Sequence, residues 1–251
     1  MKKIYKRMGY VLIILLLLVT IFIFDISIES NRIDNSIFEF ISRGVYVDSI
    51  DNFNYYKVRK KYGYEDCSNI CDDYTDINIG TIGDIYISNR DPLGDFFITE
   101  WISKRAWIGH AGIIYDQEAK KMVEIVGNDT KENNVVKIYD NTWLTKDSLE
   151  YVVLRAKDIN DQDKKNIVTE CDKIMGCKYD YTFLLGGSKR FYCTNLVSYI
   201  YKKIDVKLNK DMLFTTGSDM IINENTYIIY YRMKYVKDNK VYYNIYYLDE
   251  E

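Results

Sequence analysis

The first two dozen residues of the chain separate charged from apolar positions more sharply than any later segment. Residues 1–7 carry four basic side chains, and an apolar run then extends from Met8 to Phe24. A basic start followed by an apolar run is typical of a signal peptide or a signal anchor. Because no small-x-small cleavage site follows Phe24, we favour an uncleaved anchor. The pattern predicts a cytoplasmic basic tail at residues 1–7 and a transmembrane signal anchor at 8–25, with the rest of the chain outside the cell.

Residues 26–78 are polar, charged and only weakly periodic. This pattern predicts a stalk or linker with one helix around residues 34–60. Regular patterning begins near Ile79, so the sequence predicts a domain over residues 79–251. Its length agrees with the usual size of one domain.

Short apolar or alternating segments after Ile79 predict strands. They lie at 83–87, 108–115, 121–126, 135–139 and 151–155. Two further alternating segments, 227–236 and 241–248, flank Asp238-Asn239 and predict a closing hairpin. Helical spacing is found at 161–175, after a cap at Asn160 or Asp161 and before Gly176, and again from Cys193 to about Lys203. Strands, two helices and more strands in this order predict an α+β domain with a central antiparallel sheet.

The overall charge offers no support for nucleic-acid binding. The net charge is −3 at pH 7, and it becomes −7 once the four basic residues at the N-terminus are left aside. No basic stripe with interleaved aromatic residues is present, so we expect no nucleic-acid partner.

The segment around Cys193 suggests a reactive thiol. Leu196, Val197, Ile200 and Tyr201 recur at helical spacing, which places Cys193 at the first turn of an amphipathic helix. The unpaired N–H groups and the partial positive charge of a helix N-terminus favour the thiolate, which is the nucleophilic form of cysteine. The alternative is that Cys193 is only a small buried apolar residue.

A thiolate catalyst also needs a base, and His110 is the only histidine of the chain. It lies between small residues on a predicted strand, although a lone histidine is often a satisfied core residue. Glu124, inside the apolar segment 122–126, is the best candidate for a third group that orients the imidazole, because a buried carboxylate needs a partner. The alternative is an outward-facing glutamate on an edge strand. The oxyanion donor would be a backbone N–H of Cys193 or Thr194.

The other four cysteines allow simpler roles. Cys67 with Cys71, and Cys171 with Cys177, are close enough in sequence to form local disulfides outside the cell. Cys171 also lies on the apolar stripe of a predicted helix, which indicates core packing. Cys67, Cys71 and His110 make an incomplete set of zinc ligands, so we expect neither a metal nor a cofactor.

Taken in order, these segments resemble the circularly permuted NlpC-type hydrolases, the YiiX-like branch of the papain fold. The resemblance extends from about Thr81 to Lys203. It implies a papain-like sheet with the cysteine helix packed on it, Cys193 as nucleophile, His110 as general base and acid, and Glu124 as the orienting group. It also implies acyl transfer through an acyl-enzyme. The segments that carry it are Gly83-Asp84-Ile85, Gly109-His110-Ala111-Gly112-Ile113, Val123-Glu124, Gly176 to Phe183 (with Tyr179 and Tyr181 expected to line the cleft) and Tyr192-Cys193-Thr194-Asn195-Leu196-Val197.

Three functions are open at this point. The leading hypothesis is a membrane-tethered, extracytoplasmic cysteine hydrolase that cleaves amide bonds, with cell-wall peptides as the substrate class. The second is a lipid-directed thioesterase, amidase or acyltransferase, because the anchor keeps the enzyme near lipid. The third is a binding module on an inactive papain fold, which predicts that Cys193 and His110 lie too far apart to interact.

Overall fold

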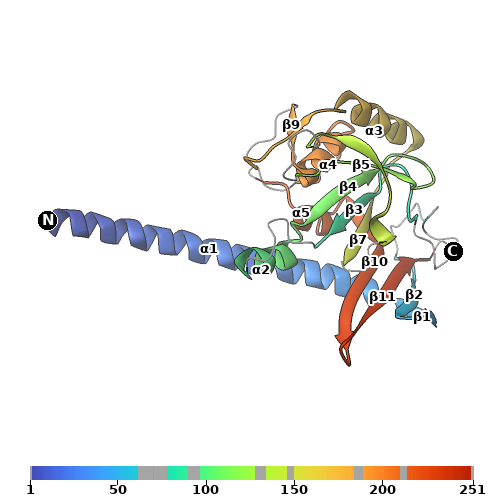
Figure 1. Cartoon of the computed structure of the whole chain (residues 1–251), viewed down its shortest axis with the longest axis horizontal. Helices are drawn as coiled ribbons and strands as arrows, with labels where there is room; N and C mark the ends of the chain where they lie inside the picture. Colours follow the sequence, from blue (N-terminus) through green and yellow to red (C-terminus); the bar gives the residue numbers. More distant parts are fainter. Residues whose placement is uncertain are drawn as a thin grey trace.

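A large mixed sheet and the helices packed around it make up the fold, an α+β arrangement as the sequence predicts (Figure 1). The computed structural model describes residues 2–61, 70, 78–89, 97–127, 134–145, 150–183, 189–209 and 214–249. Within these ranges nine strands form one sheet in the order β1-β2-β11-β10-β7-β3-β4-β5-β6. They are β1 (Gly44–Ile50), β2 (Phe53–Val58), β3 (Ile85–Ser88), β4 (His110–Ile114), β5 (Lys121–Glu124), β6 (Lys137–Asp140), β7 (Tyr151–Ala156), β10 (Thr226–Lys237) and β11 (Lys240–Leu248).

The middle of the sheet is buried. All residues of β3 and β7 are buried, and β4 is buried after its first residue. Such near-continuous apolar segments belong to strands that are covered on both faces. Neighbouring strands pair antiparallel, apart from the parallel pair β2 and β11. The strands predicted from the sequence at 83–155 are therefore present with small shifts of their ends, and all of them lie inside the sheet except β6, which forms one edge.

The helix predicted over residues 161–175 is present as α3, with the predicted residues at its two ends. The helix α3 begins after Asn160, whose side chain accepts hydrogen bonds from the N–H groups of Gln162 and Asp163, as the predicted cap requires. Gly176 adopts a positive φ of 77° just after this helix. The helices are α1 (Lys2–Ile41), α2 (Phe97–Ala106), α3 (Asp161–Lys173), α4 (Cys193–Lys202), α5 (Gly217–Ile221) and the 3-10 turn η2 (Trp143–Thr145).

The predicted C-terminal hairpin is present as β10 and β11. Lys237 pairs with Lys240, and the two residues between them, Asp238 and Asn239, have φ of 51° and 58°. Two positive φ angles are what a type I′ turn needs, and Asp and Asn accept them more easily than most residues. The hairpin is part of the main sheet because β10 also pairs with β7.

The segment 26–78 differs from the stalk expected from its sequence. Here α1 continues without a break to Ile41 and buries Ile33, Ile37 and Phe40 in the core. Residues 44–58 then form β1 and β2, and β2 pairs with β11 at the far end of the chain. The helix expected around residues 34–60 is therefore wrong beyond Ile41. A parallel pairing over such a sequence separation leaves no local signal, although both strands contain valine and aromatic residues that favour strands.

The N-terminal helix extends away from the domain. Within α1, the stretch Leu12–Ile41 is long and apolar enough to cross a membrane, with a mean hydropathy of 2.6 in its best window. Signal sequences and buried core helices meet the same criterion. In Figure 1 the N-terminal half of α1 projects to one side of the sheet, and its C-terminal part passes along the domain. Contacts with α2, α5 and β10 hold this C-terminal part in place.

Candidate active site

Cys193 is the first residue of α4. The preceding residue, Tyr192, has extended backbone angles (φ −103°, ψ 167°), and its side chain does not cap the helix. Leu196, Val197 and Ile200 are fully buried beneath the same helix, as the periodicity predicts. The thiol therefore lies among the unpaired N–H groups of a helix N-terminus, where a negative charge is stabilised.

His110 is the first residue of β4, and α4 packs across this strand. The side chains of His110 and Cys193 lie close enough for each to shift the pKa of the other. Gly112 lies two residues later on the same face of β4 and faces the side chains of β5. A Cβ at this glycine would lie 2.8 Å from the terminal methyl of Met122 and 3.5 Å from the Cβ of Glu124.

Glu124 completes the contact predicted from the sequence. Its Oε2 atom lies 2.6 Å from Nε2 of His110. Glu124 is only 8% exposed, and β6 pairs along the outer side of β5. The alternative of an outward-facing glutamate on an edge strand is therefore wrong. Because Nε2 is occupied by the carboxylate, Nδ1 is the ring nitrogen left for the thiol.

The charges of the three side chains support one another. Burial lowers the pKa of His110, but the hydrogen bonds to Cys193 and Glu124 outweigh burial and raise this pKa to about 9. Burial also acts to raise the pKa of Cys193. The hydrogen bond and the charge of His110, together with the backbone N–H groups of Ala111 and Thr194, overcome burial and lower the pKa of the thiol. The arrangement favours a thiolate–imidazolium pair near neutral pH.

Trp143 is a site residue that the sequence analysis missed. Its ring stacks on His110, with centroids 5.2 Å apart and planes inclined by 17°. The turn η2 holds Trp143 in place, because Asn141 Oδ1 accepts the Trp143 backbone N–H and the carbonyl of Leu144 accepts a hydrogen bond from Arg232. Nothing in the local sequence separates Trp143 from an ordinary core aromatic residue.

Aromatic side chains surround the start of α4. Burial raises the pKa of the Tyr179 hydroxyl most strongly, and the negative charge of the Cys193 thiolate raises it further. The Tyr179 ring is 4.8 Å from the ring of Tyr181 and 6.2 Å from that of Phe183, and Phe183 is 5.5 Å from Tyr192. Tyr179, expected to line the cleft, is thus within electrostatic range of the thiol, whereas Tyr181 is 56% exposed.

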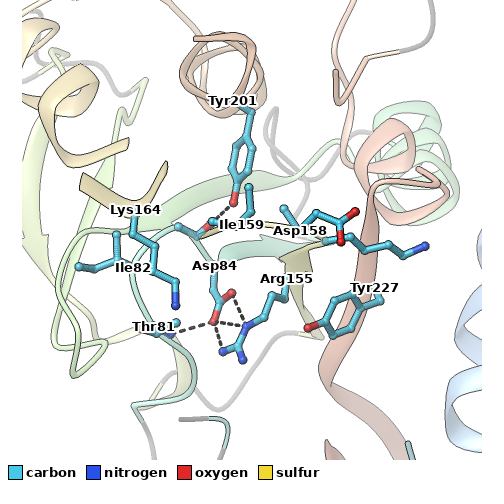
Figure 2. A pocket seen from close by; sticks show the side chains of 12 residues that line it. Thr81, Ile82, Asp84, Arg155, Asp158, Ile159, Lys164, Tyr201 and Tyr227 are labelled. Atoms are coloured by element: carbon cyan, nitrogen blue, oxygen red, sulfur yellow. Dashed lines mark hydrogen bonds and ion pairs between the residues drawn. The ribbon is translucent and has the colours of Figure 1, made fainter. Parts of the chain in front are cut away.

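Asp84 belongs to Gly83-Asp84-Ile85, the first segment of the family resemblance. It lies away from Cys193 and stabilises the fold. Its carboxylate forms a two-point ion pair with Arg155, with Nε to Oδ1 at 2.9 Å and Nη2 to Oδ2 at 2.6 Å, and also accepts the N–H of Thr81. Figure 2 shows these contacts in the wall of a cavity of about 200 Å³. Tyr201, near the last turn of α4, also lines it, so the cavity lies at the opposite end of α4 from Cys193.

The remaining cysteines are not part of this site. Cys171 and Cys177 are not joined by a disulfide, so the local pairing considered for them is wrong. Cys171 is fully buried in the core, as its stripe position indicates. Cys67 and Cys71 lie outside the described residues. No group of three His, Cys, Asp or Glu side chains that could hold a metal occurs in the part of the chain that the structure describes.

Comparison with known proteins identifies the family to which the chain belongs. Residues 80–243 match the family described as permuted papain-like amidase enzyme, YaeF/YiiX, C92 family. The chain belongs to this family. It is therefore a papain-like amidase of the cysteine peptidase type, and the resemblance read from the sequence is confirmed.

Two other comparisons add little. No curated protein matches the chain. Among solved structures, the chain is similar to a protein titled metalloprotein yiiX from Escherichia coli O157:H7, with 14% sequence identity and a TM-score of 0.44. The match covers 59% of this chain and 96% of that one.

Proposed function

We propose that this protein is a membrane-anchored, extracytoplasmic cysteine hydrolase that cleaves amide bonds through Cys193, His110 and Glu124. The observation that carries the proposal is the 2.6 Å contact between Glu124 Oε2 and His110 Nε2, together with the mutual pKa shifts that couple His110 to the thiol at the start of α4. Nucleophile, base and orienting group within hydrogen-bonding reach are the pattern of covalent acyl-transfer catalysis. The contact between Cys193 and His110 argues against an inactive binding module.

The reaction begins with attack of the Cys193 thiolate on the amide carbonyl carbon. The N–H groups at the start of α4, at Cys193 or Thr194, stabilise the oxyanion that forms. His110 then gives its proton to the departing amine, and a thioester remains on Cys193. In the second half, His110 takes a proton from water as the water attacks the thioester, which releases the acid and regenerates the thiolate. Glu124 holds the ring so that Nδ1 faces the sulfur throughout.

The N-terminal anchor determines where the catalytic domain lies in this proposal. Residues 1–7 are basic and remain in the cytoplasm, residues 8–25 cross the membrane, and the domain lies outside the cell. The apolar part of α1 supports this arrangement. The partners in this proposal are the membrane and a peptide or lipid-amide substrate. Cell-wall peptides, the substrate class expected from the sequence, remain a prediction.

Thiol labelling across pH tests this function. The full chain in detergent is treated with iodoacetamide between about pH 5 and pH 9, and modification of Cys193 is measured by mass spectrometry. An activated thiolate labels well below pH 8.5, the ordinary pKa of cysteine. We expect this labelling to slow in His110→Ala, while labelling of Cys177 changes little. Labelling of Cys193 that follows an ordinary thiol in both proteins would overturn the proposal.

A further inference from the structure

The anchor and the domain are joined by a single continuous helix. Along α1, Phe24 is 68% exposed and Ile26 is 5% exposed, so burial against the domain starts within two residues of the end of the apolar run. The helix then remains packed through Ile33, Ile37 and Phe40. With no flexible segment between anchor and domain, a membrane that holds residues 8–24 fixes the height and the orientation of the domain.

The elements that pack on α1 are the same ones that support the catalytic side chains. Helix α2 contacts α1 and ends at Ala106, just before His110. Helix α5 also contacts α1 and is joined to α2, because the Ser218 hydroxyl donates to the Ala106 carbonyl at 2.6 Å. The fit is tight, since a Cβ at Gly217 would lie 2.1 Å from the carbonyl oxygen of Trp107.

The nucleophile is tied to the same group of helices. Thr215, next to α5, accepts a hydrogen bond from the Thr194 hydroxyl through its carbonyl and donates its N–H to the Tyr192 hydroxyl. Figure 1 shows α2, α5 and β9 (Arg190–Phe191) on the side of the domain toward which the N-terminal half of α1 projects. Helix α3 lies on the other side. Through these contacts and through α2, Cys193 and His110 are connected to the helices that pack on α1, at the end of the domain where α2 and α5 lie.

Exposed aromatic side chains border this end. We define the aromatic rim as Tyr181, Phe183 and Phe214, which are 56%, 41% and 44% exposed. Phe183 contacts Tyr192, the residue before the nucleophile, and Phe214 precedes Thr215. Exposed aromatic residues are costly in water but are favoured at the boundary between water and lipid.

We infer that the active site opens toward the bilayer, and that the carbonyl it attacks belongs to the acyl chain of a membrane lipid amide or ester. This inference rests on the proposed function and specifies its substrate class. The aromatic rim lies at the membrane surface and receives the acyl chain, while residues 8–24 hold the domain at that level. A substrate dissolved in the bilayer reaches Cys193 without leaving the surface, whereas a wall peptide would have to enter between domain and membrane.

The lipid substrate uses the same chemical steps. The Cys193 thiolate forms a C–S bond to the acyl carbon, and the C–N or C–O bond breaks as His110 protonates the leaving amine or alcohol. Water, deprotonated by His110, then cleaves the thioester and releases a fatty acid. No oxidant or further reactant is needed.

A probe dissolved in the membrane tests the inference. The full chain is reconstituted in phosphatidylcholine vesicles and treated either with water-soluble iodoacetamide or with hexadecyl-iodoacetamide carried in the bilayer. In both cases the thiolate displaces iodide and forms a thioether, and modification of Cys193 is measured by mass spectrometry. The quantity compared is the ratio of the embedded-probe rate to the soluble-probe rate.

Two changes should lower this ratio. A flexible Gly/Ser insertion between Asp25 and Ile26 frees the domain from its fixed orientation, and the same insertion between Asp238 and Asn239 is the control. A rim variant, Tyr181→Ser with Phe183→Asn and Phe214→Ser, removes the lipid contact; Asn suits the positive φ of 54° at Phe183. Phe38→Ser, at an aromatic residue that is 66% exposed on α1, is the matched control.

We expect the ratio to fall about tenfold in the Asp25 insertion and in the rim variant, and to stay within about twofold in both controls. A ratio that is unchanged in both test variants, with Cys193 still activated toward the soluble probe, would overturn the lipid inference and leave the hydrolase intact with wall peptides as its substrate class. A thiol that reacts with neither probe faster than an ordinary cysteine would overturn the proposed function itself. A chain that does not float with the vesicles would overturn the anchor and the lipid inference together.

Discussion

The Nε2 atom of His110 lies 2.6 Å from the Oε2 atom of Glu124, in a partly buried contact between neighbouring strands. This contact fixes which ring nitrogen faces the thiol, and it helps to raise the pKa of the imidazole. Most of the chemistry proposed for the protein depends on it, because an unoriented imidazole neither activates Cys193 nor protonates a leaving group efficiently.

Replacing Glu124 by Gln keeps the size of the side chain and removes its charge. We expect acyl transfer to slow roughly a hundredfold, within the usual range for losing oriented acid–base catalysis. The pKa of His110 should fall, because one of the groups that raise it is lost. The measurement is the rate of p-nitrophenyl acetate hydrolysis across pH. A rate and a profile identical to those of the unmodified protein would contradict a role for Glu124 in orienting His110.

The activity should depend on pH through the two members of the thiolate–imidazolium pair. Cleavage requires the thiolate, so the rate rises with pH through the lowered pKa of Cys193. It also requires a protonated imidazole to release the amine, so the rate falls again as the pH passes about 9, the raised pKa of His110. The test is single-turnover hydrolysis of a peptide anilide as a function of pH. A rate that keeps rising above pH 10 would contradict the assignment of His110 as the acid.

Trp143 should stabilise the fold through the packing of its ring and not through a hydrogen bond of its indole N–H. Replacing it by Ala removes the face that stacks on His110 and leaves a cavity, and should lower the free energy of unfolding by about 3–5 kcal/mol. Its Nε1 atom is buried without a hydrogen-bond partner in the described part of the chain. Trp143→Phe keeps a stacked ring and removes that unpaired donor, so it should cost much less. Thermal unfolding compares the variants, and equal losses in both would contradict the stacking role.

Asp84 should be required for folding and not for chemistry. Asp84→Ala leaves the buried Arg155 guanidinium without its carboxylate, which typically costs about 3–5 kcal/mol in the free energy of unfolding. The double variant Asp84→Leu with Arg155→Met removes both charges and should recover much of that loss. Chemical denaturation gives the stabilities, and iodoacetamide labelling of the folded proteins checks the active site. A double variant less stable than Asp84→Ala would contradict this account of the ion pair.

Local patterns predicted a large part of this molecule. The helix at Cys193 follows from its apolar stripe, and the closing hairpin follows from Asp238-Asn239 between two alternating segments. Glu124 was found because a carboxylate within an apolar strand needs a buried partner. In each case the information lies within one continuous stretch of sequence.

The features that were missed depend on contacts between distant segments. Strand β2 pairs with β11, and Trp143 stacks on a histidine from another strand, without any periodic signal nearby. The helix α1 was divided at residue 25 because its polarity changes there, but its backbone continues to Ile41. The polar residues after Asp25 remain helical because this part of α1 packs against α2 and α5, which are distant in sequence.

The acyl-enzyme on Cys193 is the most direct test of the hydrolase account. The full chain in detergent is mixed briefly with p-nitrophenyl acetate, quenched in acid and analysed by mass spectrometry, alongside Cys193→Ala and His110→Ala. The account predicts one acetyl group on Cys193, formed with a burst of p-nitrophenol, slower in His110→Ala and absent from Cys193→Ala. Hydrolysis that continues in Cys193→Ala, or an acetyl group only on other residues, would contradict it.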